Sequence, residues 1–112
     1  MRERIAGAAF DDRATRAAIR EVKERHGYVI DPHGAVGWLA AKAWRKDHPA
    51  DQTVVLETAH PSKFLDVIDE ELGAGAVEVP ERLACLAGRE KVALPMAADE
   101  GMFKGWLASW GG

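Results

Sequence analysis

The chain has 112 residues and a mass of 12.2 kDa, which is the size of one domain. Apolar residues make up 47% and charged residues 29%, the balance of an ordinary globular protein. The net charge of −3 argues against a strongly basic nucleic-acid-binding surface, and no apolar run is long enough to span a bilayer. We therefore expect neither nucleic acid nor membrane as a partner.

The composition also limits metal and redox chemistry. Cys85 is the only cysteine, so it cannot form an internal disulfide or contribute to a zinc site built on several thiolates. The four histidines lack the close spacing of metal ligands, and we assign no metal site. Residues 1–4 carry charge, but no apolar stretch follows them. We therefore expect no secretory signal and a cytoplasmic location.

The first element is predicted to be a helix over residues 13–26. Asp11 and Asp12 are suitable N-cap residues, and Gly27 supplies the left-handed conformation that commonly ends a helix. The apolar side chains recur at helical spacing and form one face: Ala14, Ala18, Ile19 and Val22.

A second helix is predicted to begin at Asp31-Pro32, because aspartate is a good N-cap and proline suits the first helical position. It is expected to end at residues 46–48, before Pro49. Its apolar stripe is wide, so we expect deep burial; the stripe comprises Ala35, Val36, Leu39, Ala40, Ala43 and Trp44.

Short apolar runs elsewhere are typical of β-strands. Residues 53–56 read Thr-Val-Val-Leu without polar alternation, as in a strand buried on both faces of a parallel sheet. Residues 92–94 could form a second strand, and residues 28–30 are a shorter β-like stretch. We therefore predict an α/β fold of about four to five helices with one or two short buried strands.

Three further helices are predicted in the second half. One begins near Pro61 and ends at Gly73, a short one begins at Pro80, and the last begins at Asp99 or Glu100. The last helix presents an apolar face that we interpret as core or docking surface rather than as a cofactor site: Met102, Phe103, Trp106, Leu107 and Trp110.

Two motifs carry a family resemblance. Residues 31–37 read Asp-Pro-His-Gly-Ala-Val-Gly, and residues 58–64 read Thr-Ala-His-Pro-Ser-Lys-Phe. In this order and at this separation they resemble the C-terminal part of threonine synthase, a pyridoxal-phosphate enzyme of fold type II, the tryptophan-synthase β-subunit group. The similarity covers most of residues 9–72. Gly34 stands where the family usually carries Thr, and Ser62 where it usually carries Ala.

The resemblance implies that residues 1–112 form a single, partial domain: the C-terminal part of the large cofactor domain. The complete enzyme would convert O-phosphohomoserine to threonine and phosphate. The family's Schiff-base lysine and its phosphate-binding loop lie upstream, and nothing in this chain replaces them. We therefore assign no catalytic residue and expect no tightly bound pyridoxal phosphate on this chain alone. The expected partner is the missing N-terminal portion, a separate subunit, or a second copy in a homodimer.

Thr58 is the central site residue that the resemblance implies. A hydroxyl at this position would hydrogen-bond the pyridine nitrogen of the cofactor and leave that nitrogen weakly protonated or unprotonated. The ring would then favour elimination and replacement over transamination. A local interpretation explains Thr58 equally well, as a cap for the helix that begins at Pro61.

Four other residues belong to the implied site. The resemblance places His33 and His60 near the cofactor end of the domain, where they could orient Thr58 and the next helical turn. Asp31 is most simply an N-cap, and it too could support the site. Lys63 could meet a substrate phosphate, although an exposed lysine in a first helical turn is usually solvated.

Two alternative functions remain open from the sequence. The length and the missing lysine are also compatible with a non-catalytic docking module derived from the enzyme. A related phosphoamino-acid lyase, such as a cysteate-synthase-like enzyme, is the other alternative; Gly34 and Ser62 are the local hints of altered specificity.

Overall fold

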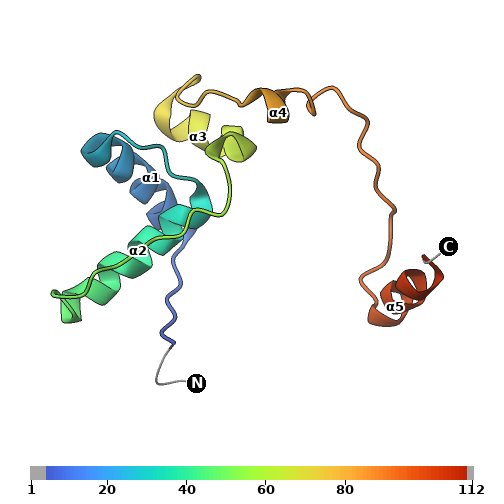
Figure 1. The fold of residues 1–112 in the computed structure, drawn as a ribbon, viewed down its shortest axis with the longest axis horizontal. Helices are drawn as coiled ribbons and strands as arrows, with labels where there is room; N and C mark the ends of the chain where they lie inside the picture. Colours follow the sequence, from blue (N-terminus) through green and yellow to red (C-terminus); the bar gives the residue numbers. More distant parts are fainter. Residues whose placement is uncertain (1–4, 111–112) are drawn as a thin grey trace. The chain divides into compact units, whose positions relative to one another are not determined.

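The computed structural model describes residues 5–110, which form two compact units that divide between Glu81 and Arg82 (Figure 1). None of the helices between residues 5 and 110 combines the length and the apolar character needed to cross a membrane. The helices in chain order are α1 (Asp12–His26), α2 (Pro32–Asp47), the 3-10 helix η1 (Pro61–Phe64), α3 (Leu65–Leu72), α4 (Glu81–Ala84) and α5 (Glu100–Ser109).

Helix α1 forms where the sequence predicts it. Asp11 Oδ1 accepts a hydrogen bond from the backbone N–H of Ala14 at 2.8 Å, which confirms the N-cap. Gly27 ends the helix with a φ of 68°, a conformation that glycine adopts without steric cost. The inward face of α1 is buried and consists of Ala18, Ile19 and Val22.

Helix α2 has the predicted start but not the predicted burial. Asp31 caps it by accepting a hydrogen bond from the backbone N–H of His33 at 2.8 Å, and Pro32 occupies the first helical position. Within the helix only Gly34 and Ala35 are buried, and Trp44 is 42% exposed. The expectation of deep burial is wrong because, among the described helices of this unit, α1 alone packs closely against α2. The rest of the apolar stripe of α2 is therefore left uncovered within the unit.

The helical turn after the second motif is also confirmed. Pro61 is buried at the start of η1, and the chain continues directly into α3. Ile68 lies fully buried in the middle of α3, and Gly73 ends the helix with a φ of 90°. The helix predicted between Pro61 and Gly73 is therefore present, with its first turn in the tighter 3-10 form.

The core of the first unit lies where α1 packs against α2 and α3. It is small for a unit of this length, and a charged residue, Asp31, is buried with it. Its buried apolar members are Ala18, Ile19, Val22, Ile30, Ala35 and Ile68.

Ion pairs join the helices of this core at the surface. Arg16 lies 2.7 Å from Glu70 and 2.9 Å from Glu71, and Arg20 also pairs with Glu71, so α1 is linked to α3. Lys42 of α2 pairs with Glu21 of α1 at 2.6 Å. The basic partners in these pairs are partly exposed to water, and ion pairs at a surface each contribute only about 0.2–1 kcal/mol, so apolar packing holds the three helices together.

The predicted α/β fold is wrong: no strand occurs between residues 5 and 110. Residues 53–56 run back along α2 without pairing to another segment (Figure 1), and Val54 and Leu56 are 84% and 77% exposed. Residues 28–30 also lack strand structure. A strand needs a neighbouring strand to satisfy its N–H and C=O groups, and the described residues of this unit supply none.

The second unit consists of α4, α5 and the segments around them. Asp99 caps α5 by accepting a hydrogen bond from the Met102 N–H at 2.7 Å, as predicted. The expected strand at residues 92–94 is absent, and Val92 is 96% exposed. No residue between 82 and 110 is buried within this unit, so its apolar side chains cover only one another.

The aromatic face of α5 illustrates that arrangement. The Trp106 ring stacks on Phe103, with ring centroids 6.0 Å apart, and on Trp110, with centroids 4.9 Å apart. Phe103 and Trp110 remain largely exposed. The predicted helix and its apolar face are therefore present, but nothing described in this unit buries them.

Candidate functional site

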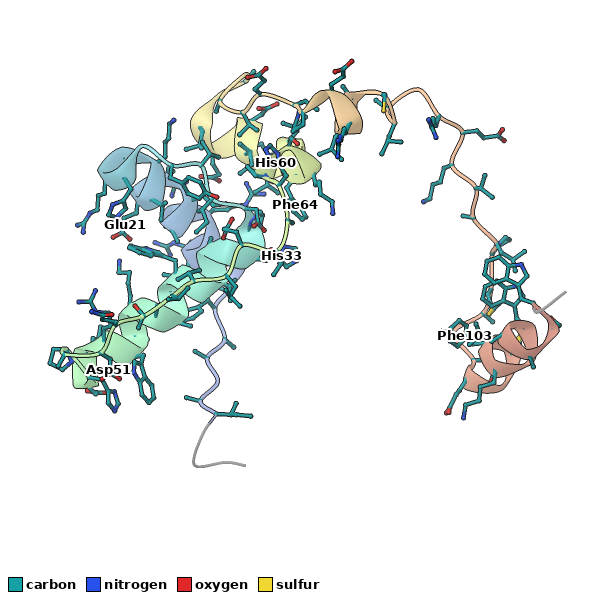
Figure 2. The ribbon with its side chains drawn as sticks, in the orientation of Figure 1. Glu21, His33, Asp51, His60, Phe64 and Phe103 are labelled. Carbon is teal, nitrogen blue, oxygen red and sulfur yellow. The ribbon has the colours of Figure 1, made fainter. Side chains whose placement is uncertain are left out.

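The structure brings the two sequence motifs together at the N-terminal end of α2. His33, in the first turn of α2, packs its ring against that of Phe64 in η1, with centroids 5.2 Å apart (Figure 2). His60 lies close by at the start of η1 (Figure 2). Two segments about thirty positions apart in the sequence therefore meet here. We call the residues at this place the motif cluster: Asp31, His33, Gly34, Glu57, Thr58, His60 and Phe64.

Asp31 is the buried centre of the motif cluster. Its Oδ1 accepts the hydrogen bond from the His33 N–H and lies 3.0 Å from Nδ1 of the His33 ring. No amide, ammonium or alcohol group of the described residues donates to Oδ2, which is also buried. Burial raises the pKa of Asp31, but hydrogen bonds from the His33 N–H, the Glu57 carboxyl and the His33 ring outweigh it and lower the pKa. Asp31 is thus ionised at neutral pH.

Glu57 is the member that sequence reasoning missed. Its side chain reaches into the space above Gly34, where an added Cβ would overlap Oε1 and lie 2.5 Å from Cδ of Glu57. Burial, the hydrogen bond to Asp31 and the negative charge of Asp31 all raise the pKa of Glu57. In the sequence Glu57 lies between the strand-like run of residues 53–56 and the motif of residues 58–64, and it belongs to neither. A glycine at position 34, where the resembling family usually has threonine, was the available signal.

Thr58 presents its hydroxyl at the surface of the motif cluster. The residue is exposed, and no hydrogen bond to its hydroxyl is formed by the described residues. The helix that begins at Pro61 is capped by His60, not by Thr58. The capping role that a local interpretation gives Thr58 is therefore filled by another side chain.

His60 acts on the first turn of η1. Its Nδ1 accepts a hydrogen bond from the Ser62 backbone N–H at 3.2 Å and lies 2.8 Å from the Ser62 hydroxyl oxygen. Because Nδ1 accepts from an N–H, it carries no proton, so the Ser62 hydroxyl donates to it and Nε2 carries the ring proton. Lys63 follows in the same turn with an exposed side chain that makes no ion pair with residues 5–110.

Two open grooves flank the segment that leads to Thr58. The larger, about 850 Å³, lies along α2 beside its small residues Gly37, Ala40 and Ala41. The smaller, about 320 Å³, is lined by Trp38, Tyr28 and Glu57 among others. Neither groove includes the side chain of Thr58, His60 or Lys63. The motif cluster of this unit is therefore a surface that could form one wall of a site, not an enclosed pocket.

Comparison with known families identifies the family of the chain. The family model described as "Threonine synthase, C-terminal" matches residues 34–105, well over half of the chain. The chain belongs to the threonine synthase C-terminal family. The matched range begins inside the first motif and contains all of the second, residues 58–64. The sequence-based resemblance to this part of threonine synthase is confirmed.

Curated threonine synthases match the same region. The chain is 36% identical to threonine synthase of Escherichia coli over 89 residues, covering 80% of this chain and 19% of that protein. It is 44% identical to threonine synthase of Corynebacterium glutamicum over 70 residues, 62% of this chain and 14% of the relative. The enzyme of Pseudomonas aeruginosa is 39% identical over 84 residues, 74% of the chain and 18% of the relative. No solved structure matches the chain.

The chain corresponds to only a small part of each relative. The chain spans less than a fifth of the length of each of these three threonine synthases. Threonine synthases depend on pyridoxal phosphate, so the motif cluster can be tested for its fit to that group. The exposed Thr58 hydroxyl, which no described residue engages, fits the need for a neutral hydrogen-bond donor to a ring nitrogen.

Proposed function

We propose that this chain supplies the C-terminal part of a cytoplasmic threonine synthase, with Thr58 as its contact to the cofactor. The complete enzyme converts O-phosphohomoserine to threonine and phosphate. The observation that carries the proposal is the Thr58 hydroxyl, which lies exposed in the family's second motif while His60 caps the adjacent helix. A hydroxyl that is released from local capping is available to a ligand.

The chemistry of a threonine hydroxyl defines what this contact does. When bound, pyridoxal phosphate supplies an electron sink for the substrate's carbon atoms. Thr58 would hold the pyridine nitrogen by a hydrogen bond from its hydroxyl group. The proton would stay on the Thr58 oxygen, because an alcohol is far too weak an acid to transfer it. A hydroxyl at position 58 would thus leave the cofactor's ring nitrogen unprotonated, and this would favour elimination and replacement chemistry. His60 keeps the following turn in place through Ser62.

The uncovered apolar side chains support a partner for this chain. Val54 and Leu56 on one side of the motif cluster project into solvent, although both are strongly apolar. We propose that the remainder of the enzyme, carried on the same chain or on a separate subunit, covers them. In the absence of that remainder, a second copy would cover them in a homodimer. Sedimentation of the chain alone over a concentration series tests the homodimer, because a chain that pairs with a second copy should associate as its concentration rises.

The chain alone should hold pyridoxal phosphate only weakly, because one wall of a site provides few contacts and must offset the full cost of association. Mixing the two and passing them through a gel-filtration column tests this. We expect the absorbance of pyridoxal phosphate to separate from the protein. Absorbance that travels with the protein and is fixed at one lysine by borohydride would show that this chain holds the cofactor itself.

A chimeric enzyme tests the role of Thr58 directly. The C-terminal segment of Escherichia coli threonine synthase that matches this chain is replaced by this chain, and phosphate release from O-phosphohomoserine is measured. Thr58→Val removes the hydroxyl while keeping the shape, so we expect kcat to fall about a hundredfold or more. Thr58→Ser retains the hydroxyl and should restore most of the lost rate.

Thr53→Val provides a matched control, because Thr53 is an exposed threonine just before the motif cluster. Its kcat should equal that of the unmodified chimera. Thermal unfolding of the Thr58→Val chimera should be nearly unchanged, since Thr58 caps no helix. Normal turnover of Thr58→Val in a folded chimera would contradict the assignment of Thr58 to the cofactor.

A further inference from the structure

A contact at the start of α2 is explained neither by the family assignment nor by the sequence motifs. It involves Asp31, Gly34 and Glu57. Gly34 is buried in the first turn of α2, and the space where its side chain would be is filled by the Glu57 carboxyl. Glu57 itself belongs to an exposed segment, so its side chain turns inward from the surface to reach this place. A carboxyl group seldom enters such a position without a partner.

The partner is Asp31. Its carboxylate is fully buried at the start of α2, and Oδ2 receives no hydrogen bond from an amide, ammonium or alcohol group of the described residues. A carboxylate with one buried, unpaired oxygen has an unmet need for a donor. The neighbouring Glu57 can meet that need in one way, by keeping its proton and donating it to Asp31.

We propose that Glu57 is a positioning residue, whose carboxyl group shares one proton with Asp31 in the space left open by Gly34 and thereby fastens the residues before Thr58 to the start of α2. The inference rests on the proposed function for the importance of Thr58, but the contact itself does not depend on any cofactor. It extends the site to two residues, Gly34 and Glu57, that act together.

The charges around the pair agree with a single shared proton. Two adjacent carboxylates that are both ionised repel each other strongly away from water, so one retains its proton. Asp31 is the ionised member, because the His33 N–H and ring both donate to its Oδ1. Tyr28, from the segment before α2, faces the pair as well. Burial and the neighbouring carboxyl groups of Glu57 and Asp31 raise the pKa of Tyr28, so Tyr28 adds no negative charge to the pair at neutral pH.

The contact has a direct consequence for Thr58. The segment of residues 53–58 forms no helix or strand, so backbone hydrogen bonding does not hold it in place. Glu57 is the residue adjacent to Thr58, and a bond from its side chain to α2 restricts the backbone at that position. This restriction limits the orientations that the Thr58 hydroxyl can take toward a ligand bound against the motif cluster.

A double-mutant cycle on the 112-residue chain tests the contact without cofactor. Gly34→Ala places a methyl group against Glu57, and we expect the folding equilibrium constant to fall about tenfold. In the Glu57→Ala background the overlap with the Glu57 carboxyl is gone, so the loss should be clearly smaller, and only the part caused by Ile30 should remain. Ile30 Cγ1, at 2.8 Å from the added Cβ, is present in both backgrounds and therefore cancels.

Gly37→Ala is the matched control, because Gly37 lies one turn further along α2 and its added Cβ would meet Val55 Cγ1 at 3.1 Å, not Glu57. Its effect should be the same with or without Glu57→Ala. Equal effects of Gly34→Ala in both backgrounds would overturn the proposal, because Glu57 would then not occupy the space above Gly34.

The pH dependence provides the second test. The pKa of Glu57 is raised above 4.5, so the folded chain binds more protons than the unfolded chain between 4.5 and the folded pKa. The stability from the shared proton is complete below pH 4.5 and is lost as the pH rises through the folded pKa of Glu57. Glu57→Gln, whose amide donates to Asp31 at every pH, should remove this loss.

Carbon-detected NMR titration of the side-chain carboxyl groups reads the same event in the chain itself. Glu57 should titrate above 4.5 and Asp31 below 3.8. Titration of Glu57 at or below its ordinary pKa would overturn the proposal, even if a variant fails to fold. The activity of the Thr58→Val chimera tests the proposed function instead. The role of Thr58 and the contact between Glu57 and Asp31 can therefore be disproved separately.

Discussion

The two units of this chain show the same kind of sequence pattern with opposite outcomes. In the first unit, the apolar face of α1 meets α2 and α3, and Ile19 and Ile68 are completely buried. In the second unit, α5 carries a larger apolar face, yet none of its described residues is buried within the unit. Each helix has an aspartate N-cap and an apolar stripe.

The difference between the units lies in what packs against each stripe. An amphipathic helix gains most of its stability by removing its apolar face from water, and α1 has two neighbouring helices that accomplish this. The face of α5 is covered only by stacking among its own rings. An apolar stripe therefore predicts a need for burial, whereas burial itself requires a partner surface.

The largest expected effect comes from core truncation. Ile68→Ala removes a fully buried side chain of the first unit and should lower the free energy of unfolding by about 3 kcal/mol. Val92→Ala removes a side chain that is almost entirely exposed, and its effect should stay within about 0.5 kcal/mol. Urea unfolding followed by circular dichroism measures both. Similar losses for the two variants would remove the distinction between the units.

The helix caps should follow the same division. Asp31→Ala removes a buried cap that also accepts from His33, and we expect a loss of about 2 kcal/mol in the free energy of unfolding. Asp99→Ala removes the exposed cap of α5, which should reduce helix content without shifting the unfolding midpoint of the first unit. A shift of that midpoint by Asp99→Ala would mean that the units stabilise each other.

Glycine substitutions should have opposite signs in the two units. Gly27→Ala forces a side chain into the left-handed conformation that ends α1, at a cost of about 1 kcal/mol. Gly105→Ala lies inside α5 with open space around the added methyl group, so α5 should gain up to about 1 kcal/mol in helix stability. Ellipticity at the helix wavelength should fall in the first variant and rise in the second.

The smallest expected effect concerns the ion pairs between α1 and α3. Glu71→Gln removes the charge that pairs with Arg16 and Arg20, and we expect a loss of about 0.5 kcal/mol at low salt that vanishes at high salt. Glu100→Gln breaks a pair within α5 alone and should leave the unfolding midpoint unchanged. A salt-independent loss for Glu71→Gln would indicate that lost packing, not lost charge, is responsible.

The candidate site was only partly readable from the sequence. The motif around Thr58 is contiguous, so a resemblance could identify it, and Asp31 was recognisable as a cap from its place before a proline. The meeting of His33 with Phe64 depends on how η1 lies against α2, which no local pattern specifies. Glu57 could not be predicted from a local pattern, because the space that it fills above Gly34 forms only when two segments distant in sequence pack together.

The sequence by itself determined where the helices begin and end, because caps and stops act within a few residues: Asp11 with Gly27, Asp31 with Pro32, and Asp99 all lie where expected. It could not determine whether residues 53–56 become a strand. That outcome depends on a second strand to accept the backbone hydrogen bonds, and the described chain has none. Tertiary structure alone decided which apolar faces are buried and which carboxyl group fills the space over α2, because both depend on segments distant in sequence.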